Sequence, residues 1–240
     1  MRPGPSGVSE RAARRFDGLR AAALSAIADG ALSDLLADPP PPPAGRCLAV
    51  IGRLVDQTAA AAVARTVAAI DEQLGRLGTD VWRYPAASLH LSVLAVSGRE
   101  SEPTFDAARR QRAIDAFPPA NLTASPPFGF RLGRVGLTGP QLFVEVVPDD
   151  RRWATLRGDV AELARRIGEA PLVFPDTEPV HLNVARLTGP VVDHTALVAA
   201  ITGPSLDIGL AIDRLELVLT DFTVSDEATT VLSGGGRTPR

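Results

Sequence analysis

The sequence contains one cysteine, no lysine and no apolar run long enough to cross a membrane. The lone Cys47 excludes a disulfide framework and any multi-cysteine zinc or iron–sulfur site, and it fits the reducing cytoplasm in which we expect the protein. Because Cys47 opens an apolar run, we expect a small buried core residue rather than a nucleophile. All 25 basic residues are arginine, and the abundant alanine, glycine and proline are typical of a GC-rich bacterial genome.

The chain also lacks an excess of positive charge. Its net charge is −3 at pH 7, so no global basic field indicates nucleic-acid binding, and any contact with RNA has to be local. Arg14, Arg15 and Phe16 faintly resemble a twin-arginine export signal, but Arg20 and Asp29 interrupt the apolar stretch that export needs. We therefore expect neither export nor a membrane partner.

An N-terminal extension over residues 1–45 precedes the main domain. Its apolar residues recur at helical spacing from Ser9 to Leu36, with Ser9 as a candidate N-cap and glycines that allow two helices. Pro39–Pro43 is an unbroken proline run, which predicts a stiff polyproline spacer. We expect the helix to pack on the body, with a lid or partner-binding helix as the alternative; its protein partner is unknown.

Residues 46–233 read as a tandem strand–helix–strand–helix–strand repeat. The pattern predicts an α+β fold with two lobes, about 46–137 and 138–233, whose antiparallel-rich sheets face a central groove and carry helices on their outer faces. Strands can be exchanged between the lobes. The glycine-rich residues 234–240 are expected to form a disordered tail. The predicted strands are 48–55, 89–96, 128–135, 142–147, 180–187, one within 208–220 and a last one at 229–232; the predicted helices are 58–77, 103–117, one after 150, and 193–201.

Two of the three histidines occupy the same short frame. The frame reads apolar, His, Leu, small polar, Val in 89–93 and again in 180–184. Because side chains alternate along a strand, His90 and Ser92 point to one side, as do His181 and Asn183. The third histidine, His194, follows a candidate N-cap at Asp193 and is expected at the surface.

Two imidazoles on one groove suit a reaction that needs a general base and a general acid near neutral pH. Opening or transesterification of a phosphodiester is such a reaction, and a hydroxyl or amide two residues along can donate to a phosphate oxygen. No carboxylate lies beside either histidine on the same strand face, so we expect no metal site and no cofactor.

The paired frames resemble the His-x-Ser/Thr motifs of the two-histidine (2H) phosphoesterase superfamily, over about residues 46–233. Its best-known members are bacterial 2′-5′ RNA ligase-like proteins that act as RNA 2′,3′-cyclic phosphodiesterases. The resemblance implies a bilobal α+β module in which His90 and His181 are the acid/base pair and Ser92 holds phosphate. The implied substrate is an RNA end or a small cyclic nucleotide. Asn183 departs from the Ser or Thr of that family, although its amide can still donate.

Two functions for the core therefore stay open, and a third reading makes the N-terminal helix and the proline spacer the functional part, with the core as a scaffold. One is a metal-independent phosphoesterase, which opens 2′,3′-cyclic phosphates or acts on 2′-5′ linkages. The other is a catalytically degenerate RNA- or nucleotide-binding module, which the change at Asn183 favours.

Four further residues are candidates for contact with the substrate. Trp82 and Tyr84 lie in a predicted loop and can stack on a base, although packing at the mouth of a sheet explains them equally well. Arg134 lies on a predicted hairpin that can rim the groove. Arg186 can clamp a phosphate, but strict alternation puts it on the face opposite His181 unless a bulge intervenes.

Overall fold

The computed structural model describes residues 7–37, 44–54, 57–76, 80–101, 104–117, 127–171, 180–191, 193–203, 205–221, 224 and 228–235. The proline run 39–43 lies outside these residues. Within them, no helix is both long and apolar enough to span a membrane.

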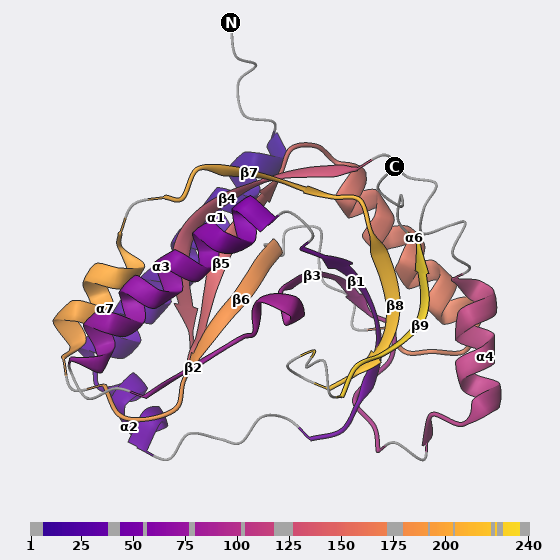
Figure 1. Ribbon diagram of the computed structural model, residues 1–240, viewed down its shortest axis with the longest axis horizontal. Helices are drawn as coiled ribbons and strands as arrows, with labels where there is room; N and C mark the ends of the chain where they lie inside the picture. The colour runs from indigo at the N-terminus through magenta and orange to yellow at the C-terminus, as the bar shows by residue number, and fades with distance from the viewer. Residues whose placement is uncertain are drawn as a thin grey trace, which may run out of the picture.

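The strands form two antiparallel sheets (Figure 1). Each sheet takes strands from both halves of the sequence, and together they confirm the predicted α+β class. In order across the first sheet, the strands are β3 (His90–Ala95), β1 (Cys47–Arg53), β8 (Leu215–Thr220) and β9 (Thr230–Gly235). In order across the second sheet, they are β2 (Val81–Arg83), β6 (Val180–Leu187), β5 (Gln141–Pro148), β4 (Phe128–Thr138) and β7 (Ile208–Ile212).

The helices form where apolar residues recur every three or four positions. In α3, for example, Val63, Val67, Ile70 and Leu74 make one buried stripe. α3 and α7 pack beside the second sheet, and α4 and α6 beside the first (Figure 1). The helices are α1 (Gly7–Ala28), α2 (Ala31–Ala37), α3 (Gln57–Gly75), α4 (Ala107–Ala116), α6 (Arg152–Arg166) and α7 (His194–Ile201), with a short 3₁₀ helix η1 (Ala86–Ser88).

The structure corrects four local predictions. Residues 208–220 hold two strands, β7 and β8, which belong to different sheets. Trp82 and Arg83 lie on the short strand β2, not in a loop. Gly234 and Gly235, predicted to begin a disordered tail, pair with β8 as part of β9. Ser9 lies inside α1 instead of capping it. Strand pairing explains the first three differences, and the fourth arises because α1 begins two residues before Ser9.

The N-terminal helix packs on the body, as predicted. Phe16, Ala23 and Ile27 lie on one side of α1, seven and four residues apart, and each is at least nine-tenths buried. The short helix α2 follows and buries Leu32 and Leu36. α1 contacts β4 and β5 of the second sheet, which brings it close to the strand that carries His181.

Candidate functional site

His90 is buried at the start of β3. It pairs directly with Arg53 of β1, and its Nδ1 lies 2.8 Å from the carbonyl oxygen of Ser88 in η1. A carbonyl oxygen only accepts, so Nδ1 carries the hydrogen and Nε2 keeps its lone pair. The backbone thus fixes both the orientation of the ring and its tautomer.

The same surroundings keep His90 neutral. Burial lowers the pKa of His90 from its ordinary 6.5 to about 4, and the Ser88 carbonyl opposes this only in part. The positive charges of Arg53 and His181 lower the pKa further. At neutral pH His90 is therefore an uncharged imidazole with a lone pair on Nε2.

An ion-pair network beside His90 is a feature that the sequence reading missed. Arg53 Nε donates to Glu216 Oε2 at 2.9 Å, and Arg214 Nη2 lies 2.7 Å from Glu216 Oε1. Glu216 is 2% exposed, so two arginines share one buried carboxylate and leave an excess of positive charge near His90. The sequence signal was present, because Glu216 is the one charged residue in the apolar strand Leu215–Thr220.

His181 lies on β6, exposed to solvent. The edge of its ring meets the Phe143 ring of β5, with centroids 5.6 Å apart and planes at 61°. Glu145, also on β5, pairs directly with His181 across the two strands. Side chains of directly paired residues share one side of a sheet, so His181 has a carboxylate neighbour that reasoning along its own strand did not find.

Each histidine frame ends in a β-bulge at its valine. On β3 the pairing with β1 skips Val93, and on β6 the pairing with β5 skips Val184. In both strands the extra residue follows directly after the small polar residue of the frame. The repeat is therefore visible in backbone geometry as well as in sequence, and each bulge changes which side the following residues face.

The small polar partners of the two histidines differ in environment. Ser92 is exposed on the same side of β3 as His90. Asn183 is half-buried on the same side of β6 as His181, and its Oδ1 is buried without a hydrogen-bond partner. The amide nitrogen is then the end of Asn183 that a ligand can reach.

The bulge at Val184 turns the side chain of Arg186 to the same side of β6 as His181. Arg186 pairs with Gln141, which lies two residues from Phe143 on the same side of β5. Arg186 therefore shares a face with His181. We call this face of the second sheet the His181 face; it comprises His181, Asn183 and Arg186 of β6 and Gln141, Phe143 and Glu145 of β5.

Trp82 and Tyr84 also lie on the His181 face. Trp82 pairs directly with Arg186, and its ring meets that of Tyr84 edge-on at 4.6 Å. Trp82 is 38% exposed, whereas Tyr84 is 6% exposed and its hydroxyl lacks a hydrogen-bond partner. Burial raises the pKa of Tyr84, opposed in part by Gln141, whose amide lies near the hydroxyl but outside hydrogen-bond geometry, and by Arg186.

Arg134 occupies a bulged part of β4, on the far side of β5 from His181. Its side chain is exposed, and its backbone N–H donates to Glu145 Oε2 at 3.3 Å. The structure thus places Arg134 next to Glu145, not beside either histidine.

The two frames come together in space. β3 contacts β6, and His181 is close enough for its charge to lower the pKa of His90. His194 lies elsewhere, on α7, where its Nε2 is 2.8 Å from the hydroxyl of Ser33. Asp193 caps α7 through the backbone N–H groups of Thr195 and Ala196, as predicted.

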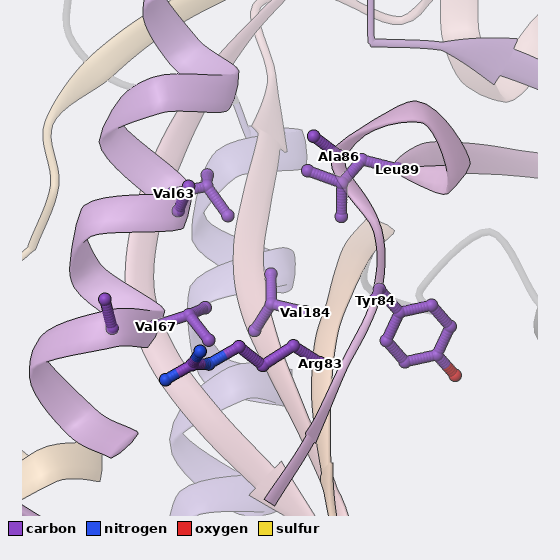
Figure 2. Close-up of a pocket in the computed structure, with 9 residues that line it drawn as sticks. Val63, Val67, Arg83, Tyr84, Ala86, Leu89 and Val184 are labelled. Carbon is purple, nitrogen blue, oxygen red and sulfur yellow. The ribbon is translucent and has the colours of Figure 1, made fainter. Parts of the chain in front are cut away.

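An apolar cavity of about 200 Å³ lies between α3 and β6, where Val184 of β6 lines it (Figure 2). Val63 and Val67 of α3 face Val184 and Leu89 across it, while the ring of Tyr84 points away from α3 (Figure 2). Neither histidine lines this cavity. Its lining is mainly aliphatic, and Arg83 and Tyr84 are the residues with polar side chains that border it.

Among the residues that the structure describes, no group of three or more His, Cys, Asp or Glu side chains could hold a metal ion.

Two solved structures share this arrangement of sheets. TT0787 of Thermus thermophilus matches 78% of this chain and 96% of its own, with a TM-score of 0.51 and 18% sequence identity. LigT of E. coli, crystallised with 3′-AMP, matches 82% of this chain and 100% of its own, with a TM-score of 0.51 and 16% identity. The chain has the two-histidine phosphoesterase fold. No protein-family model matches the sequence, and no curated protein matches it.

The two-histidine phosphoesterase fold spans both neighbours almost completely but only about four-fifths of this chain.

Proposed function

We propose that the protein is a phosphoesterase that needs no metal ion and acts on 2′,3′-cyclic phosphates or 2′-5′ linkages, at RNA ends or in small nucleotides. The observation that carries the proposal is the pairing of two different imidazoles. His90 is buried, neutral and oriented by a backbone carbonyl, while His181 faces solvent within electrostatic reach of it. Two neighbouring titratable groups whose environments push their pKa values apart are suited to act as a base and an acid in one reaction.

The environments favour His90 as the base and His181 as the acid. For a cyclic phosphate, His90 Nε2 removes a proton from water as the water oxygen attacks phosphorus. The P–O bond to the ribose oxygen breaks, and protonated His181 donates its proton to that leaving oxygen. The two imidazoles then return to their starting protonation states by proton exchange with solvent.

Phosphate contacts would come from both sheets. The Ser92 hydroxyl and the Asn183 amide nitrogen are donors on the same strand faces as the two histidines. The excess positive charge of Arg53 and Arg214 over Glu216 would attract the anion and stabilise the charge that develops on it.

The nucleoside would lie toward β2. Trp82 is exposed on the His181 face beside Arg186, where it can stack on a base while the guanidinium contacts a phosphate. LigT, which has the same fold, binds 3′-AMP. When a 2′,3′-cyclic phosphate opens by breaking the bond between phosphorus and the 2′ oxygen, the product carries its phosphate at the ribose 3′ position. A 3′-nucleotide bound to LigT therefore supports the proposed substrate class.

The test uses the purified full chain with chelator and a panel of 2′,3′-cyclic nucleotides and 2′-5′-linked dinucleotides. His90→Ala and His181→Ala should each lower kcat/KM by about 10²- to 10⁴-fold with the fold retained by circular dichroism. His194→Ala, which changes the one histidine outside the site, is the matched control and should keep full activity. Retained hydrolysis in either site variant, or loss of wild-type activity in chelator, refutes the proposal.

The alternative is a nucleotide-binding module that has lost turnover, favoured by Asn183 in place of a hydroxyl residue. Asn183→Thr restores the hydroxyl and separates the two. If wild type binds nucleotides without turnover and Asn183→Thr gains no activity, the binding function is the correct one.

A further inference from the structure

α1 lies against the His181 face of the second sheet, although it belongs to the N-terminal extension. The ring of Phe16 stacks on Phe143 with centroids 6.2 Å apart, and Phe143 in turn meets the edge of the His181 ring. One turn along α1, Arg20 forms an ion pair with Glu145, the residue that pairs directly with His181 across the strands. Two independent contacts thus connect α1 to the surroundings of one imidazole.

The sheet is shaped to receive these contacts. A Cβ at Gly136 would lie 2.4 Å from the Phe143 ring, and a Cβ at Gly133 would lie 2.9 Å from Glu145 Oε2. Both glycines are on β4, directly beneath side chains that lean across from β5. Glycine at these two positions leaves the space that the Phe143 ring and the Glu145 side chain occupy.

The aromatic contact and the ion pair between α1 and β5 are both largely shielded from solvent. Phe16 is 3% exposed, and the side chains of Arg20 and Glu145 are each 12% exposed. Burial raises the pKa of Glu145, and the backbone N–H of Arg134 and the charge of Arg20 oppose that rise. Arg20 thus favours the charged form of a carboxylate that lies beside His181.

We propose that α1 is a positioning element of the active site: Phe16 holds Phe143 against the His181 ring, and the Arg20–Glu145 pair sets the charge beside it. This inference rests on the proposed role of His181. It also limits the substrate, because α1 covers the β4–β5 part of the His181 face and leaves β6 and β2 for the nucleotide.

The charge environment of His181 has an expected sign. Charged and titratable groups reach this region from several elements. They are Asp17 and Arg20 on α1, Arg134 on β4, Glu145 on β5, Arg186 on β6, Tyr84 directly after β2, His90 on β3 and Arg53 on β1. Removal of the Arg20 charge makes the surroundings more negative and raises the pKa of His181. Removal of the Glu145 charge does the opposite.

The experiment measures the pKa of His181 by NMR titration of the full chain, with resonances assigned from His90→Asn and His194→Ala. Arg20→Gln should raise it by about half a unit and Glu145→Gln should lower it by about the same amount. The double variant should return close to wild type. Arg76→Gln, which breaks an exposed ion pair with Glu72 on α3, is the matched control and should leave the titration unchanged.

Phe16→Ala tests the aromatic contact. It should shift the His181 ring-proton resonances and lower kcat by about tenfold with little change in KM, and Phe16→Leu should recover part of the loss. Unchanged His181 titration in both charge variants, or shifts of the same sign, overturns the inference. The titration needs no turnover, so opposite shifts in a protein without phosphodiesterase activity would support the role of α1 and refute the proposed function alone.

Discussion

The neutral state of buried His90 predicts that this one residue makes the protein sensitive to acid. In the unfolded chain His90 takes up a proton near its ordinary pKa of 6.5, whereas the folded protein resists protonation until about pH 4. Between these values the unfolded state binds more protons, so the free energy of unfolding falls as the pH falls. Two-state linkage gives a loss of about 2.5 kcal/mol between pH 7 and pH 4.5 from His90 alone.

His90→Asn removes the titration but keeps a side-chain N–H that can donate to the Ser88 carbonyl. Urea unfolding, followed through the fluorescence of the buried Trp153, gives the free energy at both pH values. The variant should lose about 2.5 kcal/mol less than wild type over this range, since contributions from all other groups cancel in the comparison. Arg76→Gln, which breaks an exposed ion pair on α3, is the control and should follow wild type. If His90→Asn loses as much stability as wild type, the buried neutral histidine is refuted, and with it the assignment of His90 as the base.

Urea unfolding at pH 7 should give three further outcomes. Gly136→Ala should lower the free energy of unfolding by about 1–3 kcal/mol, because the new methyl group meets the Phe143 ring, while Gly18→Ala, which has open space around it, should not lower it. Tyr84→Phe should raise stability by about 1 kcal/mol, because it removes a buried hydroxyl without a partner; a loss would mean that the hydroxyl is bonded. Glu216→Gln should cost about 3 kcal/mol by leaving its two arginines without their carboxylate, and a cost near zero would contradict the buried network.

Local patterns in the sequence predicted most of the elements. The stripe of Val63, Val67, Ile70 and Leu74 predicted α3, and all four are buried. The range predicted for the strand of His181 matches β6 at both ends. These predictions succeed because a helix or strand that buries one face must repeat apolar residues at its own period. β2 has three residues and was missed, since three residues are too few to show a period.

The side on which Arg186 lies shows where local reasoning stops. Strict alternation puts it opposite His181, and one extra residue, Val184, reverses that. The bulge arises where β6 pairs with β5, and β5 lies some 35 residues earlier in the chain. The sequence of β6 alone contains no signal for it.

The sequence by itself determined the chemistry available to this protein. It supplies two histidines in matching frames, each with a small polar residue on the same side of its strand, and it contains no lysine and only one cysteine. The tertiary structure decided how the two histidines differ. It buries His90 against Ser88 and Arg53, leaves His181 exposed beside Glu145, and sets α1 against that second histidine. Burial and charge depend on neighbours that are distant in sequence, so equal frames acquire unequal proton affinities only when the two sheets come together.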